Sequence, residues 1–378
     1  MVRISGDEAR LHLLTHLGLA GRRYRGRRGV RSMLRDLRCI QLDPLDAIGT
    51  NADLVALARV DGISKGDVYR HTMPGHAFEH FAKERCILPA SAYPHYRDQA
   101  VQTPWWRLHA RLERLDRAII DRVEAEVAAR GPITARDLTD HGQVRALDWS
   151  GWKGTSKATA MALEVLWTQC RVLVTERTAA GKRFDVPERA LPRVHDAPAL
   201  PFERWALLER VEAAGFLARA GGPCWSMLRD ARTSDLPDAL VAEGLLEEVT
   251  IEGSRRPYLA PAGFRDQKHA VPDDRLVILA PLDPLLWDRK LVKQVFDFEY
   301  IWEVYKPKSA RRWGWYVCPL LHRGRLVGRL EGHVDGDTLV VVRVWPEEGE
   351  TLVPGALDDA LARHAEALGC AYYSVDAR

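Results

Sequence analysis

The 378-residue sequence has few cysteines, no long apolar run and little lysine. Its six cysteines stand at least 47 residues apart, so it has no CxxC pair and a zinc site is not expected. No stretch of 18 apolar residues occurs, and histidines and a threonine break the stretch 11–19, which predicts neither a membrane span nor a signal peptide. We therefore expect a soluble cytoplasmic protein with reduced, mostly buried thiols.

The net charge is small, because 55 basic and 52 acidic residues leave +3. Arginine outnumbers lysine by 45 to 10, and arginine suits bidentate contacts with phosphate and carboxylate. A GC-rich genome, which the abundant alanine also indicates, explains much of the same bias. With 46% apolar and 28% charged residues, the chain has the composition of a globular protein of about two to three units.

Three consecutive segments repeat a pattern of helices followed by a strand pair. The first is expected to hold a helix after Ser5, a helix over 29–38, a strand over 39–42 and a helix after Pro44. The second holds helices over 105–130, 135–140 (capped by Thr134) and 156–169, then a hairpin of 172–175 and 183–186. The third holds helices over 202–213 and 235–243 and strands around 246–249 and 257–259.

From Leu276 the pattern changes to strands. They are expected over 277–279, 299–305, 315–321, 326–331 and 339–345, with turns at Gly324, Gly332 and Gly336 and a final helix over 354–368. Helices followed by a hairpin are typical of a winged helix. We predict an α+β fold with three tandem winged-helix units (1–104, 105–198 and 199–272) and a small C-terminal β-rich domain (273–378).

The first of three basic stretches, Gly21–Arg31, has six arginines in eleven residues, no acidic residue and Tyr24 between the charges. Such a cluster suits contacts with DNA phosphates, and its glycines let the backbone approach closely. A solvated loop is the commoner outcome for a charge run and is the alternative. The candidate DNA ligands are Arg22, Arg23, Arg25, Arg27 and Arg28.

The second basic stretch, Trp152–Lys157, stands at the start of the helix expected over 156–169. In a winged helix this is the recognition helix, whose first residues reach the nucleic acid. Lys153, Ser156 and Lys157 are the candidate phosphate ligands. A plain helix cap with solvated lysines is the alternative.

The third basic stretch, Lys306–Tyr316, begins with four positive charges and continues into a Trp-Gly-Trp-Tyr run. Basic residues with interleaved aromatics can follow a DNA backbone and stack on bases. Trp315 and Tyr316 are expected to face a core, whereas Trp313 is expected to be exposed at the end of a strand. The candidate DNA ligands here are Lys306, Lys308, Arg311, Arg312 and Trp313.

The Gln41-Leu42-Asp43 stretch is a candidate catalytic motif. On a strand, Gln41 and Asp43 project to one side and Leu42 to the other, so the amide and the carboxylate can hold one water between them. The alternative is a structural cap, because Asp-Pro is an ordinary turn pair and Leu-Asp-Pro-Leu occurs again at Leu282–Leu285. From these residues alone, capping ranks first.

Several of these stretches together resemble the AlkX/AlkZ (YcaQ-like) family of winged-helix DNA glycosylases. The resemblance covers most of the chain and rests on four blocks of sequence, of which the fourth, 279–316, is the most specific. It implies a C-shaped array of winged helices that forms a basic channel for duplex DNA. It also implies hydrolysis of the N-glycosidic bond of alkylated purines, including bulky adducts and interstrand crosslinks. The blocks are Gln41-Leu42-Asp43, 79–89, 152–153 with 163–164 and 184–189, and 279–316.

The resemblance further implies the catalytic residues. Family members carry a Gln-aliphatic-Gln or a Gln-aliphatic-Asp motif. Gln41 and Asp43 match the second version, which is typical of the AlkX-like branch. Because of this match, a catalytic role of Asp43 now ranks above a capping role. Lys83 stands where members commonly have histidine, which leaves the substrate preference open. We expect no cofactor and no metal. We expect a monomer whose partner is double-stranded DNA that carries alkylated or crosslinked purines. When bound to DNA, the protein is expected at the nucleoid.

Two other functions remain open from the sequence. One is a non-enzymatic winged-helix DNA-binding protein such as a transcriptional regulator, although no sustained heptad for a dimerisation helix is present. The other is a homologue that binds lesions without hydrolysing them, against which Asp43 argues. The lesion, the groove contacts, and repair as opposed to antibiotic self-resistance also stay open.

Overall fold

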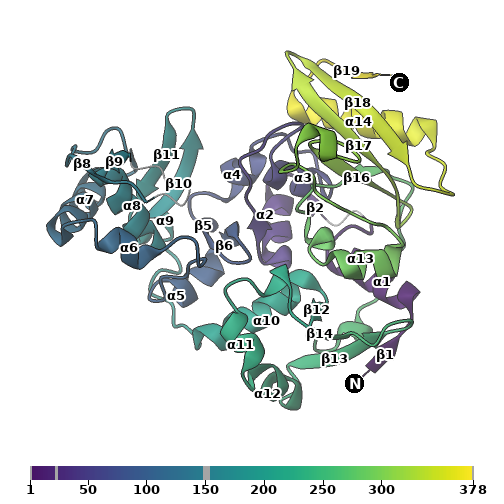
Figure 1. Cartoon of the computed structure of the whole chain (residues 1–378), viewed down its shortest axis with the longest axis horizontal. Coiled ribbons are helices and arrows are strands. Elements are labelled where there is room, and N and C mark those ends of the chain that lie inside the picture. The colour runs from purple at the N-terminus through teal and green to yellow at the C-terminus, as the bar shows by residue number, and fades with distance from the viewer. Residues whose placement is uncertain (1, 22–23, 148–153, 377–378) are drawn as a thin grey trace. The chain divides into compact units, whose positions relative to one another are not determined.

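The computed structural model describes residues 2–21, 24–147 and 154–376. It is a mixed α+β structure whose chain divides into two units, residues 1–68 with 207–378 and residues 69–206 (Figure 1). The predictions for Arg22, Arg23 and Lys153 lie outside the described residues.

The first 72 residues alternate short strands with helices. Ser5 starts the first helix with a capping box: its hydroxyl accepts the N–H of Glu8 at 3.1 Å, and the Glu8 carboxylate accepts the N–H of Ser5 at 2.7 Å. The helix predicted after Ser5 is thus confirmed. The elements are β1 (Val2–Ile4), α1 (Gly6–His16), β2 (Tyr24–Arg25), α2 (Gly26–Leu37), β3 (Ile40–Gln41), α3 (Asn51–Leu57), β4 (Val60–Asp61) and α4 (Asp67–Thr72).

A solvated loop was the alternative considered for the basic stretch 21–31, and the described part of the stretch does not form one. Strand β2 pairs in parallel with β4, and α2 begins at Gly26, three residues before the predicted start at Gly29. Tyr24 anchors the stretch, because its ring is buried and its hydroxyl donates to Asp36 at 2.7 Å. The helix predicted after Pro44 begins only at Asn51, where Thr50 caps it.

Residues 202–266 confirm the helices and the strand pair predicted for the third segment. Their sheet has the order β1-β13-β14-β12, in which β1 runs parallel to β13 with Val2 opposite Val249. The N-terminal strand thus completes a sheet whose other strands lie more than 200 residues further along the chain. The elements are α10 (Phe202–Ala214), β12 (Leu217–Ala218), η2 (Pro223–Trp225), α11 (Arg229–Thr233), α12 (Leu236–Ala242), β13 (Leu246–Ile251), β14 (Pro257–Pro261) and η3 (Phe264–Asp266).

The C-terminal part is a five-stranded sheet in the order β15-β16-β17-β18-β19, seen with α14 in Figure 1. Helix α14 has the bounds predicted from the sequence. The elements are β15 (Val277–Ile278), η4 (Pro284–Leu286), α13 (Arg289–Phe296), η5 (Lys308–Ala310), β16 (Val317–His322), β17 (Arg325–Asp335), β18 (Thr338–Pro346), α14 (Pro354–Leu368) and β19 (Tyr372–Val375).

Two predictions in this part are wrong. Residues 299–305 form no strand; Tyr300 is buried there, and its hydroxyl donates to the carbonyl of Val317 at 2.8 Å instead of joining a ladder. Gly332 makes no turn but lies inside β17, opposite Val341. A Cβ at this position would approach the Val340 carbonyl to 2.8 Å, so the glycine permits close contact between two strands.

The unit of residues 69–206 contains the predicted hairpin, now β10–β11, and β7 joins it as a third strand in the order β10-β11-β7. The elements are β5 (Ala77–Phe81), β6 (Arg85–Pro89), η1 (Ala90–Ala92), α5 (Tyr93–Tyr96), α6 (Leu108–Leu112), α7 (Arg117–Arg130), β7 (Ile133–Thr134), β8 (Gln143–Arg145), β9 (Thr155–Lys157), α8 (Ala158–Thr168), β10 (Leu173–Thr178), β11 (Gly181–Asp185) and α9 (Pro187–Ala190).

Two helix predictions in this unit are also corrected. The long helix 105–130 is two helices, α6 and α7, because the Asp116 carboxylate accepts the N–H of Ala118 at 2.9 Å and starts α7 afresh. The short helix 135–140 is absent. There the Thr134 hydroxyl donates to Asp137 at 2.7 Å, which stabilises a turn after β7.

Candidate active site

The Gln41-Leu42-Asp43 motif lies where strand β3 ends, so only Gln41 belongs to the strand. The predicted strand alternation therefore does not reach Asp43, which follows the strand and turns the chain. Its Oδ1 accepts the N–H of Leu45 at 2.9 Å. Gln41 is buried and Asp43 is half-buried, so the carboxylate is the more exposed of the two side chains.

The Asp43 carboxylate lies in a partly desolvated environment. Burial raises its pKa, and the hydrogen bond from Leu45 opposes this only in part. The buried phenol of Tyr316 lies near enough to feel this charge: burial raises the pKa of Tyr316, and Cys318 and Asp43 raise it further. Tyr316 therefore stays protonated at neutral pH.

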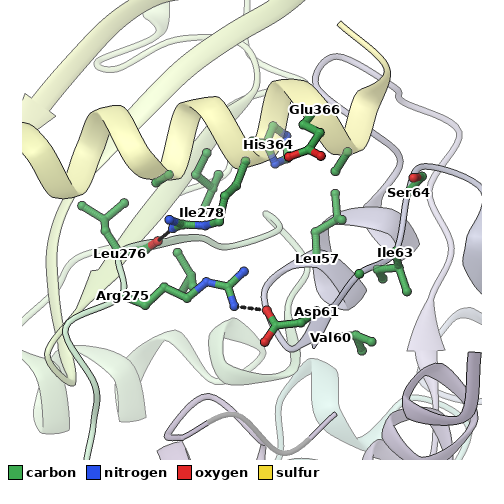
Figure 2. A pocket seen from close by; sticks show the side chains of 15 residues that line it. Leu57, Val60, Asp61, Ile63, Ser64, Arg275, Leu276, Ile278, His364 and Glu366 are labelled. Atoms are coloured by element: carbon green, nitrogen blue, oxygen red, sulfur yellow. Dashed lines mark hydrogen bonds and ion pairs between the residues drawn. The ribbon is translucent and has the colours of Figure 1, made fainter. Parts of the chain in front are cut away.

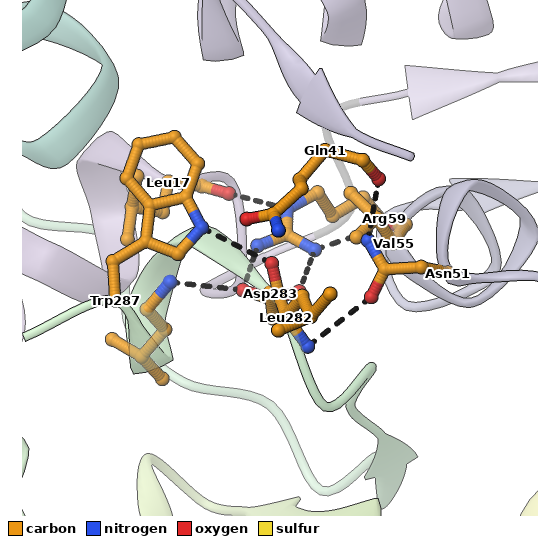
Figure 3. A network of polar contacts seen from close by, with 9 residues as sticks. Leu17, Gln41, Asn51, Val55, Arg59, Leu282, Asp283 and Trp287 are labelled. Carbon is orange, nitrogen blue, oxygen red and sulfur yellow. Dashed lines mark hydrogen bonds and ion pairs between the residues drawn. The ribbon is translucent and has the colours of Figure 1, made fainter. Parts of the chain in front are cut away.

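A buried amide holds the backbone of the motif (Figure 3). Asn51, at the start of α3, donates from Nδ2 to the Gln41 carbonyl at 2.8 Å. Its Oδ1 accepts the N–H of Leu282 at 3.1 Å, and the Leu282 carbonyl accepts Nε1 of Trp287 at 3.1 Å. Asn51 thus ties the motif to the turn that precedes η4, which lies 240 residues further along the chain.

A buried ion pair fixes the same turn (Figure 3). Arg59 contacts Asp283 with two parallel hydrogen bonds of 2.7 and 2.8 Å, and neither side chain is exposed. Arg59 also donates to the carbonyls of Leu17 and Val55 at 2.6 and 3.0 Å, and Asp283 accepts the N–H of Leu285 at 3.0 Å. Because each charge is compensated, the pair can be buried without an unsatisfied group.

Sequence reasoning did not select Asn51, Arg59, Asp283 or Tyr316 as functional candidates. Two of them carried a signal: Asp283 belongs to the second Leu-Asp-Pro-Leu stretch, and Tyr316 ends the Trp-Gly-Trp-Tyr run. Asn51 and Arg59 carried none, since a polar residue among apolar neighbours reveals neither its partner nor its burial.

The described residues of the first basic stretch stand at the start of α2. Arg25, Arg27 and Arg28 are all exposed. Tyr24 is only 5% exposed and bonded to Asp36, so it is not free to stack on a base. This end of α2 therefore presents three cations to solvent without an aromatic partner from this stretch.

The second basic stretch precedes its helix instead of opening it. Ser156 and Lys157 lie on β9, which pairs with β8, and α8 starts at Ala158. Lys157 is exposed and contacts Asp140 at 3.2 Å. The Ser156 hydroxyl is buried and has no hydrogen-bond partner among the described residues.

In the third basic stretch, acidic residues neutralise part of the charge. Lys306 contacts Glu303 at 2.8 Å and Arg312 contacts Glu299 at 3.5 Å. Lys308 is exposed, and Arg311 donates to the carbonyl of Lys306 at 2.8 Å. No hydrogen bond or ion pair between described residues joins this cluster to Arg25, Arg27 or Arg28.

The aromatic residues of this stretch differ from the prediction. Trp313, expected to be exposed, is half-buried, with Trp345 at 5.8 Å and the Arg329 guanidinium 4.1 Å from its ring centre. Trp315, expected in a core, is 39% exposed because β16 starts only at Val317. Tyr316 is buried, as predicted.

A cavity of about 270 Å³ lies between β4, β15 and α14 (Figure 2). Most of its charged and titratable groups are already engaged: Arg275 pairs with Asp61, the Arg363 guanidinium donates to the Leu276 carbonyl at 3.0 Å, and His364 contacts the Ile48 carbonyl at 2.8 Å. Because these groups hold the fold together, we do not take this cavity as a candidate for catalysis.

The described residues contain no group of three or more His, Cys, Asp or Glu side chains placed to hold a metal ion. The six cysteines form no disulfide and five are buried, as predicted. In the same part of the chain, no helix is both long and apolar enough to cross a membrane.

The chain is similar to DNA glycosylases. Residues 34–369, which include the motif and the turn at Asp283, match the AlkZ-like DNA glycosylase family, so the chain belongs to that family. Its fold is similar to that of the Streptomyces sahachiroi DNA glycosylase AlkZ. The TM-score is 0.61 over 99% of this chain and 100% of the other, at 17% sequence identity.

Proposed function

We propose that the protein hydrolyses the N-glycosidic bond of N7- or N3-alkylated purines in duplex DNA. The observation that carries the proposal is a half-buried carboxylate, Asp43, beside Gln41, in a chain of the AlkZ-like DNA glycosylase family. Bulky adducts and interstrand crosslinks belong to the proposed substrates, in DNA repair or in self-resistance to a genotoxin.

The leaving base needs no general acid from the protein, because an N7- or N3-alkylated purine already carries positive charge. Its bond to C1′ breaks with both electrons going to the base, which leaves an oxocarbenium-like sugar. Asp43 stabilises this cation through its negative charge. Water, positioned by the Gln41 amide, adds to C1′ and gives its proton to Asp43. No lysine Schiff base forms, so strand cleavage does not accompany base release.

The partial burial of Asp43 supports this role. A carboxylate that is poorly solvated interacts more strongly with a nearby cation than one in bulk water. Its raised pKa also makes it a better acceptor for the water proton. The Asn51 contact and the Arg59–Asp283 pair limit how far the motif can shift, which suits a site that must be ordered before the lesion arrives.

DNA binding is assigned in this proposal to the three basic stretches. The exposed Arg25, Arg27, Arg28, Lys157 and Lys308 are available for phosphates without breaking a buried contact. The division into three winged-helix units and a C-terminal β-rich domain, acting as a monomer, belongs to the same proposal. For the second predicted winged-helix unit, residues 105–198, the support is the three-stranded sheet β10-β11-β7, whose β10–β11 hairpin follows α8 in the chain.

A base-release assay tests the activity. The protein is incubated with duplexes that carry 7-methylguanine, a bulky N7 adduct or a nitrogen-mustard crosslink, and free base and strand breaks are measured separately. We expect released base and intact strands bearing abasic sites. Binding of every duplex without release from any of them would refute hydrolysis and favour a non-enzymatic DNA-binding protein.

A further inference from the structure

A second cavity, of about 310 Å³, lies in the unit of residues 69–206. Its wall comes from β6, α8 and the turn of the β10–β11 hairpin, and it contains no residue of the Gln41-Leu42-Asp43 motif. Three of its residues are cationic, Arg85, Arg136 and Lys182, whereas Trp167 and Phe184 contribute aromatic surface. Arg85, Glu164 and Phe184 fall within the blocks 79–89, 163–164 and 184–189, to which the proposed hydrolysis gives no role.

The three cations have no hydrogen-bond or ion-pair partner in the described part of the fold, and Arg85 contacts aromatic rings instead. Among the described residues, no acceptor forms a hydrogen bond or ion pair with the side chains of Arg85, Arg136 or Lys182. Glu164 also lines the cavity, but its carboxylate is engaged by Nε of Arg111 at 3.0 Å. Like charges gathered at a partly buried site repel one another, so their arrangement is favourable when an anion lies between them.

The wall behind the cations is rigid. The Arg85 guanidinium lies 4.7 Å from the ring centre of Trp167, whose Nε1 donates to the Glu79 carbonyl at 3.0 Å. The buried Glu79 carboxylate in turn accepts two hydrogen bonds from Arg177, at 2.5 and 2.6 Å. Arg85 is thus held among aromatic rings, because the Trp106 and Phe81 ring centres also lie 5.5 and 5.8 Å from its guanidinium, and its N–H groups remain for an anion.

We propose that this cavity binds a nucleotide unit, with Arg85, Arg136 and Lys182 around its phosphate and its base against the apolar wall. Guanidinium edges bind phosphate and an apolar wall suits the face of a base, so the cavity offers a surface for each part. The site goes beyond the proposed hydrolysis and does not depend on which lesion is removed. A free nucleotide and a nucleotide of a DNA strand share the chemistry, and the test distinguishes them.

Calorimetric titration of the full-length protein compares four probes: deoxyadenosine 5′-monophosphate, adenosine, inorganic phosphate and a single-stranded deoxyadenosine tetranucleotide. We expect the monophosphate to bind at least about tenfold more tightly than adenosine or phosphate, because only it offers both an anion and a ring. A tetranucleotide that binds tighter still identifies a DNA strand as the occupant. Equal affinity of the two nucleotide probes identifies a free nucleotide.

Two variants test the residues. Lys182→Gln and Arg136→Gln remove a cation without breaking a hydrogen bond of the fold, so the thermal midpoint should stay unchanged. Each should weaken binding of the monophosphate about tenfold. Arg122→Gln, which removes an exposed cation of α7 outside the cavity, is the matched control and should leave the affinity unchanged.

The pH gives an independent readout. Burial, together with Arg85 and Arg177, lowers the pKa of Lys182 to about 8, against the opposing effect of Glu79 and Glu164. Affinity for the tetranucleotide, whose phosphodiesters do not titrate in this range, should therefore fall between pH 7 and pH 9. Lys182→Gln should remove that fall.

The proposal is overturned if neither nucleotide probe binds, or if phosphate or adenosine binds as tightly as the monophosphate. It is also overturned if the two cavity variants behave like Arg122→Gln. Base release is measured separately, so a failure here is distinguishable from a failure of the proposed hydrolysis.

Discussion

The Asp43 carboxylate is half-buried, and burial raises its pKa above the ordinary value of 3.8. When it is protonated, Asp43 neither stabilises the sugar cation nor accepts a proton. We therefore expect the rate of base release to fall as the pH is lowered through this raised pKa. A pH–rate profile of single-turnover release measures it, and a rate that stays constant down to about pH 4 would contradict the role of Asp43.

The same pKa determines how Asp43 affects stability. Because folding raises the pKa, the folded state binds the proton more tightly, and the contribution of Asp43 to the free energy of unfolding falls as the pH rises from 3.8 through the folded-state pKa. Replacement by asparagine, whose oxygen can still accept the N–H of Leu45, should not lower the thermal midpoint at pH 7. Asp43→Asn is therefore a variant in which activity and folding can be separated.

Asn51 positions the backbone of the motif without being a catalytic residue. Asn51→Leu leaves the buried Gln41 carbonyl and the Leu282 N–H without partners, which should lower the free energy of unfolding by about 1–3 kcal/mol. If the proposed function holds, kcat should fall while KM for the lesion duplex changes little. Urea unfolding and base-release kinetics check the two effects; unchanged stability would show that Asn51 does not support the motif.

Among the elements, the turn around Asp283 depends on a pair that only the structure reveals. Arg59→Met or Asp283→Leu alone leaves an uncompensated buried charge and should cost about 3–5 kcal/mol. The double variant removes both charges and should be more stable than the sum of the two losses implies. A double-mutant cycle by urea unfolding measures the difference; simple additivity would contradict a coupled pair.

The elements with a local signal were predictable from the sequence. Ser5 with Glu8 specifies the start of α1, and the residues flanking the β10–β11 turn specify its hairpin. The helix 105–130 was predicted as continuous because its periodicity persists through residues 113–116, and the Asp116 cap decides otherwise. The segment 299–305 is rich in the aromatic and β-branched residues that favour a strand, but the Tyr300 hydroxyl bonds outside any ladder.

The candidate site was predictable only in part, for a similar physical reason. The type and spacing of Gln41 and Asp43 can be read from the chain, and their resemblance to a family motif selects them. The contacts that hold them join Asn51 to Leu282 and Arg59 to Asp283 over more than 200 residues. Such pairings depend on the tertiary fold, and no local pattern encodes them.

For the whole molecule, the near-neutral net charge conceals local clusters of basic residues. Arg25, Arg27 and Arg28 are exposed and are proposed phosphate ligands. Their joint replacement by glutamine should reduce the slope of log K against log salt by about 2–3 for a duplex, since each phosphate contact contributes about 0.9. Fluorescence anisotropy at several salt concentrations measures the slope, with Arg122→Gln as control. An unchanged slope would place these arginines outside the DNA interface.

The most direct test of the account is the single-turnover release of 7-methylguanine from duplex DNA by wild type and Asp43→Asn. We expect the variant to lose at least about 100-fold in rate, the scale on which removal of one electrostatic stabiliser acts. Its affinity for the same duplex should stay within about twofold, because Asp43 is not a phosphate ligand. Undiminished release by Asp43→Asn would contradict the assignment of Asp43 as the catalytic carboxylate.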